Sequence, residues 1–308
     1  MISLISNCKS NFVLIVFVYL ILSGFFILAA QRTNREYLDT SKYFIVNLEN
    51  APYPHSSRGK GYKYNNKFYN LQDHYNDSRV AFYIPRGYNQ KKNVDILVHF
   101  HGWYAELSDI MERDRLAEQV SISRKNVILI VPQGPKNAPD SVYGKLETKN
   151  GFKNFIKESL TLLKNKGYTT STRPGRIVIS GHSGAYHVIS LIVTRGGLIE
   201  NISEVYLFDA LYGELEKFVY WFDNYNVKFI NLYIKPGATY ERVKTILEDL
   251  SDWDYPYIDI YYHQLSKKII KRNHIIFISS SADHNEIVHK NNPLARLLNA
   301  SRLKTIKR

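Results

Sequence analysis

Short apolar runs that alternate with helix-like segments are the feature that most constrains the fold of this chain. Seven runs rich in β-branched and aromatic residues predict strands: Arg79–Pro85, Val94–Phe100, Asn126–Val131, Arg176–Ser180, Val205–Phe208, Val227–Ile234 and His274–Ser280. The later runs are continuously apolar and lack the polar alternation of a half-exposed strand. They therefore predict strands buried on both faces of a parallel sheet.

The segments between these runs have helical patterns. Apolar residues recur along one face of residues 152–163, and Gly167 follows as a C-terminal cap. Residues 185–194 are apolar on most faces, and residues 214–222 and 240–250 predict two further helices. Repeated alternation of this kind predicts an α/β protein with a doubly wound, mostly parallel sheet, helices on both faces and right-handed crossovers.

The segment ISGHSGAY places Ser183 between a predicted strand and a predicted buried helix. A strand–turn–helix junction is the context of a nucleophile elbow, in which the serine backbone takes a strained positive φ and its neighbours are small. Gly181 and Gly184 meet that demand, and Ala185 is the next smallest residue at the last position. Because the phosphate-loop and dinucleotide fingerprints are absent from the sequence, we favour a nucleophile over a structural turn or a phosphate site.

A nucleophilic serine needs a base and an acid that orients the base, and the predicted strand ends supply both. Asp209 directly follows the strand at Val205–Phe208, and His284 follows the last strand. Asp209 is the favoured acid, although it could instead cap the following turn, and His284 is the favoured base. The alternatives that stay open are Glu241 and Asp283 for the acid and His289 for the base.

The sequence His101-Gly102-Trp103 ends a predicted strand, where a backbone N–H can face a developing oxyanion. Trp103 and Gly184 are the predicted donors. His99 and His101 also form an H-x-H pair, but no further zinc ligands follow nearby, so we expect neither a metal nor a cofactor.

The N-terminal region carries a nearly continuous apolar run of 19 residues, Phe12–Ala30, close to the ~20 that span a bilayer. Leu28 occupies a position where a signal-peptide cleavage site needs a small residue, so we favour an uncleaved anchor over a cleaved signal. Either one predicts a folded part on the periplasmic or extracellular side rather than in the cytoplasm. The predicted organisation is an anchor or signal segment at 1–31, an extended leading segment with a hairpin at 32–78, and a catalytic domain at 79–308.

The formal net charge of +13 raises the question of nucleic acid as a partner. The sequence has no zinc-finger spacing, no basic region with heptads and no RNA-binding signature, so a solvated basic surface is favoured. An anionic membrane surface is the intermediate hypothesis. The single cysteine, Cys8, excludes an intrachain disulfide framework.

The ordered motifs HFHGW, VISGHSGAY, VYLFDALYG and SADHNEIV resemble the α/β-hydrolase superfamily. More narrowly, they are similar to a group of bacterial α/β-hydrolase-like proteins with HG, GHSGG-type and LFDALYG motifs. The resemblance covers roughly residues 79–300 and implies an eight-strand-type sheet with a triad of Ser183, His284 and Asp209. The chain departs from the pattern at Ala185, which replaces a glycine, and in an acid that follows the strand one step earlier than usual.

These observations predict an exported or membrane-anchored serine hydrolase that forms an acyl-enzyme. A small-molecule or lipid-like ester is the favoured substrate, ahead of an amide or peptide. Residues 136–151 and 210–225 could line its pocket with aromatic side chains, namely Tyr143, Tyr212, Trp221 and Phe222. The alternative is a non-catalytic, membrane-tethered binding or envelope protein that keeps the same fold.

Overall fold

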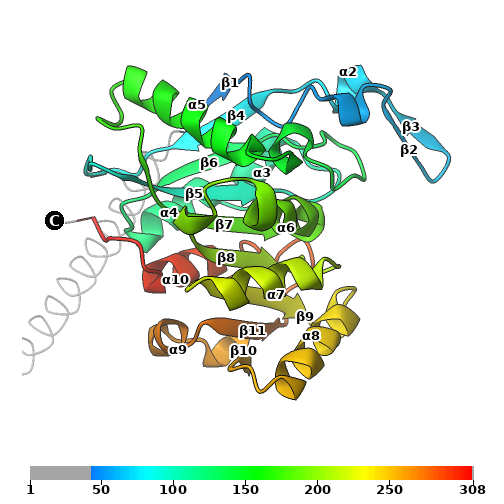
Figure 1. The fold of residues 1–308 in the computed structure, drawn as a ribbon, viewed down its shortest axis with the longest axis vertical. Helices are drawn as coiled ribbons and strands as arrows, with labels where there is room; N and C mark the ends of the chain where they lie inside the picture. The colour runs from blue at the N-terminus through cyan, green and yellow to red at the C-terminus, as the bar shows by residue number, and fades with distance from the viewer. Residues whose placement is uncertain (1–42, 307–308) are drawn as a thin grey trace, which may run out of the picture. The chain divides into compact units, whose positions relative to one another are not determined.

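A computed structural model describes residues 43–306, in which nine strands form one mixed, mostly parallel sheet (Figure 1). In sheet order the strands are β1 (Phe44–Asn47), β4 (Arg79–Tyr83), β6 (Ile128–Pro132), β5 (Val94–Phe100), β7 (Pro174–His182), β8 (Ile202–Phe208), β9 (Lys228–Ile234), β11 (Ile275–Ser280) and β10 (Ile258–Tyr261). All neighbours from β6 to β10 are parallel, and β4 runs antiparallel to both β1 and β6. The predicted doubly wound α/β architecture is confirmed.

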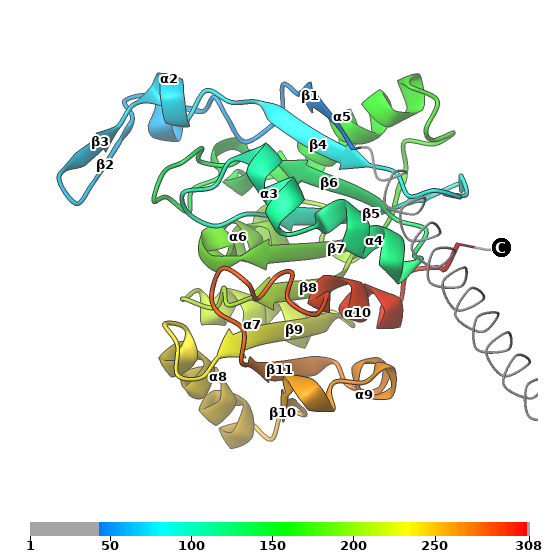
Figure 2. The ribbon, with the colours of Figure 1, turned by 180° about the vertical axis from the view of Figure 1, so that it is seen from behind.

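Helices cover both faces of this sheet. One face carries α5 (Gly151–Asn165), α6 (Tyr186–Arg195), α7 (Leu215–Asn224) and α8 (Tyr240–Asp252) (Figure 1). The other carries α3 (Leu107–Arg113), α4 (Leu116–Ser123), α9 (Lys267–Arg272) and α10 (Pro293–Ala300) (Figure 2). In β5, Ile96 and Val98 pack under the first set and Leu97 under the second. A strand covered on both faces must be apolar at successive positions, which explains the continuous runs in the sequence.

The leading segment is partly integrated into the sheet. β1 pairs with β4, and the predicted hairpin is present as β2 (Tyr62–Tyr64) and β3 (Lys67–Tyr69), followed by the short helix α2 (Leu71–His74). The hairpin turn is Asn65-Asn66, with φ values of 45° and 61°, as a two-residue turn of this kind requires. The compact unit comprises Tyr43–Arg308, so it includes the leading segment from Tyr43 onward.

No helix within residues 43–306 has the length and apolar character needed to cross a membrane. The anchor predicted for residues 1–31 lies outside the described residues.

Candidate active site

Loops at one edge of the sheet carry the predicted site residues. Ser183 follows β7, Asp209 follows β8, His284 lies beyond β11, and Trp103 lies just beyond β5. Because parallel strands end at the same edge, these side chains converge although they are far apart in sequence.

The imidazole of His284 lies between Ser183 and Asp209. Its Nε2 is 3.0 Å from Ser183 Oγ, and its Nδ1 is 2.5 Å from Asp209 Oδ2. The other carboxylate oxygen, Oδ1, accepts the hydroxyl of Thr239 at 2.5 Å, and both Asp209 and Thr239 are buried. An ionised carboxylate only accepts hydrogen bonds, so Nδ1 carries the proton and Nε2 is free to accept the serine hydroxyl. This arrangement can remove the proton from Ser183 Oγ.

The competing acids and base lie elsewhere. Glu241 is exposed in the first turn of α8, where its Oε2 pairs with Lys244 Nζ at 3.0 Å. His289 Nδ1 faces the buried Asp114 at 3.6 Å. Within the described part of the chain, neither Glu241 nor Asp283 forms a side-chain hydrogen bond with His284.

The backbone at the serine has the strain that the motif predicts. Ser183 has a φ of +54°, in the left-handed region that non-glycine residues rarely occupy. It begins the 3₁₀ turn η3 (Ser183–Ala185), which leads into α6. A Cβ on Gly181 would lie 2.8 Å from Ala185 Cβ and 2.5 Å from Ile189 Cδ1. The two sides of the turn therefore touch, and Gly181 leaves no room for a side chain.

The turn after β5 packs directly against the serine. A Cβ on Gly102 would lie 2.6 Å from Ser183 Cβ and 3.2 Å from its Oγ. His101 fixes this turn because its Nδ1 donates to the Gly102 carbonyl at 2.8 Å while its Nε2 accepts the Gly134 N–H at 2.8 Å. The turn therefore brings Trp103 next to the serine, and a Cβ on Gly184 would lie 2.7 Å from the Trp103 ring.

Three histidines lie buried beneath the site, and we call them the buried histidines: His99, His101 and His182. Burial lowers the pKa of His99 and His182 to about 3 and that of His101 to about 4. His182 packs against His284: its Nε2 lies 2.8 Å from the His284 carbonyl oxygen, and the two ring centroids are 4.6 Å apart. Because burial keeps its ring neutral, His182 places no positive charge beneath the base.

A cavity of about 470 Å³ opens above Ser183. Its lining residues are Gly102, Trp103, Tyr104, Ala105, Arg113, Ser141, His182, Ser183, Gly184, Tyr186, Tyr212, His284 and Asn285. Burial and the nearby Asp209 raise the pKa of Tyr212 to about 12, so its hydroxyl stays protonated at neutral pH. Of the four aromatic residues expected at the pocket, Tyr212 does line it, whereas the others are buried in the core: Tyr143, Trp221 and Phe222. Those three fill space between helices and sheet.

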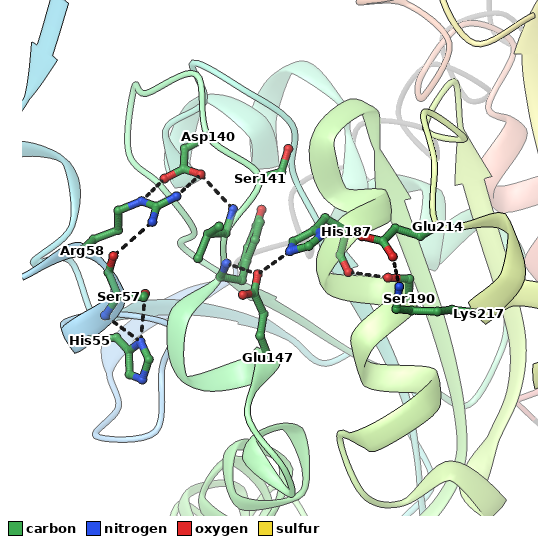
Figure 3. Close-up of polar contacts among 12 residues, drawn as sticks. His55, Ser57, Arg58, Asp140, Ser141, Glu147, His187, Ser190, Glu214 and Lys217 are labelled. Carbon is green, nitrogen blue, oxygen red and sulfur yellow. Dashed lines mark hydrogen bonds and ion pairs between the residues drawn. The ribbon is translucent and has the colours of Figure 1, made fainter. Parts of the chain in front are cut away.

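The leading segment contacts the loop that carries Ser141, a lining residue of the cavity, and Figure 3 shows the ion pair that Arg58 forms with Asp140 in this loop. Arg58 holds Asp140 with two hydrogen bonds, of 2.6 Å from Nε and 2.9 Å from Nη2, and Asp140 precedes the wall residue Ser141. Ser141 in turn accepts the indole N–H of Trp103 at 2.9 Å. The aromatic wall is therefore fixed through residues upstream of the predicted domain boundary.

His187, on α6, contacts two glutamates from different loops, Glu214 and Glu147 (Figure 3). Its Nδ1 lies 3.0 Å from Glu214 Oε1, just before α7, and its Nε2 lies 3.9 Å from Glu147 Oε1, at the end of the 3₁₀ turn η2 (Gly144–Glu147). Tyr186, the neighbouring residue on α6, lines the cavity. His187 thus connects the elements on either side of the nucleophile helix.

A larger cavity, of about 700 Å³, lies at the opposite edge of the sheet, around the first residues of β5, β7 and β8. None of the described residues that line it is a histidine. Five of its lining residues are basic and two are acidic: Lys91, Lys92, Arg176, Arg302 and Lys304, against Asp95 and Glu200.

No family model matches the sequence, and no curated protein matches it. Solved structures do match. A mutant of the feruloyl esterase module from Clostridium thermocellum, complexed with sinapinate, is 13% identical with a TM-score of 0.51, over 84% of this chain and 88% of that one. A ferulic acid esterase is 13% identical with a TM-score of 0.51, over 83% of this chain and 98% of that one. This likeness shows that the protein has an α/β-hydrolase-type fold.

Proposed function

We propose that this α/β-hydrolase-type protein is a serine hydrolase that cleaves carboxylic esters. The observation that carries the proposal is the position of His284, whose two ring nitrogens contact Ser183 Oγ and the buried Asp209 carboxylate at the same time. A serine held in a strained turn, a base within hydrogen-bond reach and an acid that fixes the base together form the arrangement used for nucleophilic acyl transfer.

In the proposed reaction, Ser183 Oγ attacks the ester carbonyl carbon while His284 Nε2 takes the hydroxyl proton. Asp209 accepts a hydrogen bond from Nδ1–H throughout, which holds the ring in one tautomer and stabilises the imidazolium that forms. The imidazolium then gives its proton to the departing alkoxide, leaving an acyl-serine and a free alcohol. Water attacks the acyl-serine with His284 again as base, which releases the acid and restores the serine.

The oxyanion of each tetrahedral intermediate needs donors, and we assign them to the backbone N–H groups of Trp103 and Gly184. Support comes from the close approach of Gly102 to Ser183, which brings the following peptide next to the reacting serine. Losing one such donor costs roughly 10²–10³-fold in kcat, so the fixed geometry of this turn matters to the rate.

The substrate we propose is a small ester with an apolar or aromatic part. The walls of the cavity are rich in aromatic side chains, namely Trp103, Tyr104, Tyr186 and Tyr212. The C. thermocellum feruloyl esterase module, which shares the fold, is complexed with the aromatic acid anion sinapinate. A lipid-like ester is the longer-chain version of the same proposal.

Labelling by a fluorophosphonate probe tests this function on the full chain in mild detergent. We expect wild-type protein to be labelled and Ser183→Ala and His284→Ala to lose labelling. The matched controls, Ser251→Ala and His263→Ala, replace exposed residues and should label like wild type. A folded wild-type protein that does not react would refute the proposal and favour a binding protein on the same fold.

We also propose that the protein is exported or membrane-anchored, with the basic edge of the sheet toward anionic lipid. Support for the export or anchoring comes from the apolar run Phe12–Ala30. The larger cavity at that edge has an excess of basic residues. Each basic residue near an anionic leaflet contributes about 1 kcal/mol of attraction.

Fractionation of cells and intact mass of the full-length product test this location. Recovery in the membrane fraction at full mass is expected for an uncleaved anchor, and loss of the first 30 or so residues would show a cleaved signal. Recovery of full-length protein in the cytosol would contradict both.

Flotation assays test whether the basic edge of the sheet binds anionic lipid. Phosphatidylglycerol vesicles should retain more wild-type protein than a triple variant, Lys91→Gln, Lys92→Gln and Lys304→Gln. Equal retention of the two proteins would exclude binding through this edge.

A further inference from the structure

The cavity above Ser183 has a charge that ester hydrolysis alone does not require. Among its thirteen described lining residues, Arg113 is the one with a permanent charge, and none is an aspartate or a glutamate. Burial keeps the neighbouring His182 neutral, since its pKa is lowered to about 3. A neutral ester offers no group that needs a guanidinium, so Arg113 calls for a separate explanation.

The guanidinium of Arg113 is held in a fixed orientation at the end of α3. Its Nε and Nη2 donate to the two carboxylate oxygens of Asp114, at 2.8 Å and 2.9 Å. A bidentate pair of this kind fixes the plane of the fork as well as its position. Within residues 43–306, Arg113 Nη1 donates to no other group, so one end of the fork is available to a ligand.

Charge compensation of Asp114 explains the ion pair but does not by itself require the guanidinium to reach the cavity wall. Asp114 is 1% exposed, whereas the Arg113 side chain is 40% exposed and reaches the cavity wall. Asp109 and Glu112, the two acidic residues of α3, are exposed and lie outside the lining. The Arg113–Asp114 pair therefore places an oriented guanidinium at the cavity wall, whereas the Asp114 carboxylate is not among the lining residues.

We propose that the cavity selects esters that carry a carboxylate, which Arg113 Nη1 binds while the ester carbonyl lies at Ser183. This inference rests on the proposed function and names the substrate class for the same site. Guanidinium groups recognise carboxylates through charge-assisted hydrogen bonds, and a partly desolvated aromatic cavity strengthens them. The carboxylate can lie on the acyl or the alcohol side of the ester.

Two matched substrate pairs test the proposal with the full chain. Mono-4-nitrophenyl glutarate is compared with 4-nitrophenyl pentanoate, and 4-acetoxybenzoate with its methyl ester. The first pair carries the carboxylate on the acyl side and the second on the alcohol side. For the charged ester of the pair that matches the site, we expect Arg113→Gln to lower kcat/KM roughly 10- to 100-fold. The kcat/KM values of the neutral esters should change by less than about threefold. Because each substrate is compared between enzymes, differences in intrinsic reactivity cancel.

Arg113→Lys keeps a cation beside Asp114 and covers the case in which Arg113→Gln does not fold. It should retain part of the preference for the charged ester, since lysine supplies charge without the fork. Lys164→Gln, an exposed change on α5 that removes the same charge, is the control and should leave both pairs unchanged. Equal effects of the Arg113 variants on charged and neutral esters, or no effect, would overturn the inference.

Fluorophosphonate labelling separates this failure from failure of the function. Arg113→Gln protein that is labelled and hydrolyses neutral esters, with no loss on either charged ester, refutes only the carboxylate site. Wild-type protein that neither labels nor hydrolyses any of the four esters refutes the hydrolase proposal, and the inference with it.

Discussion

Replacing Gly102 with alanine tests whether the turn after β5 sets the position of the serine hydroxyl. The new Cβ would lie 2.6 Å from Ser183 Cβ and 3.2 Å from the carbonyl oxygen of His182, whereas ordinary contacts begin at 3.4 Å. Relief of the first contact alone requires 3.4 − 2.6 = 0.8 Å of movement. Gly102 is not in the left-handed region of φ, so alanine is compatible with its backbone and the clash is the whole perturbation.

This movement falls on the atoms of the proposed triad. The neighbours of the new methyl group belong to the strained turn itself, so adjustment shifts Ser183 relative to His284 Nε2, now 3.0 Å from Oγ. A misplacement near 1 Å lowers activity roughly 10²-fold, and overpacking costs about 1–3 kcal/mol of stability. We therefore expect kcat/KM for a short-chain 4-nitrophenyl ester to fall about 100-fold in a protein that still folds.

Steady-state kinetics, the rate of fluorophosphonate labelling and thermal denaturation measure these effects. Gly59→Ala is the matched control, because its nearest contact, Ser56 O at 3.4 Å, is already an ordinary one. It should change neither activity nor stability. A folded Gly102→Ala variant with kcat/KM within about threefold of wild type would refute the reasoning, since the turn would then be free to move.

Buried polar groups lead to three further predictions. Thr239→Val removes the donor to Asp209 Oδ1, so kcat should fall about tenfold in steady-state assays, and an unchanged kcat would contradict this. Asn231→Leu replaces a buried amide whose nitrogen and oxygen lack partners within residues 43–306, and should raise the urea-measured free energy of unfolding by about 1–3 kcal/mol. Between about pH 6.5 and 4 the buried histidines bind protons in the unfolded state and not in the folded state, because burial lowers their pKa. The free energy of unfolding should therefore fall as the pH is lowered through this range, by roughly 1 kcal/mol per pH unit for each of the three histidines. His182→Asn removes one of these groups and should make that pH dependence less steep.

The sequence predicted best those strands that helices cover on both faces of the sheet, because such strands are continuously apolar. The predicted Val94–Phe100 coincides with β5, and the last predicted run differs from β11 by one residue. β7 begins at Pro174, before its apolar run, because Val94 on the neighbouring β5 pairs with Pro174 and extends the ladder. β1 was not predicted because its apolar run, Phe44 to Val46, is only three residues long and lies in the segment interpreted as an extended leading chain.

The helices on the face of the sheet that carries α3 show a weaker helical pattern in the sequence. α3 and α9 have seven and six residues, fewer than two full turns, so a 3.6-residue period has no room to repeat. α4 follows Arg115 in the left-handed conformation, which no side-chain pattern marks. These elements are determined by packing against the sheet rather than by their own periodicity.

The candidate site divides in the same way. The sequence predicts where strands end, and parallel strands end at the same edge, so it was possible to select Ser183, Asp209 and His284. The sequence does not predict contacts between residues that are far apart in the chain. Thr239 lies 30 residues from Asp209, and His182 lies 102 residues from the carbonyl it faces. Arg113 gave no signal either, because an arginine at a helix end is ordinarily solvated.

Asp209, the proposed acid, follows a strand one step earlier than the resemblance implies, and the loop after β9 offers a physical explanation. The resemblance places the usual acid one strand later than β8, and in this chain that later loop supplies Thr239, whose hydroxyl donates to Asp209 Oδ1. Asp209 itself has a φ of +43°, and its N–H donates to the Leu232 carbonyl on β9 at 2.8 Å. β9 thus anchors the backbone of the acid, and its loop occupies one carboxylate oxygen, which leaves Oδ2 for His284. Two strand ends therefore act on the same carboxylate, because β8 provides it and β9 fixes the direction in which it points.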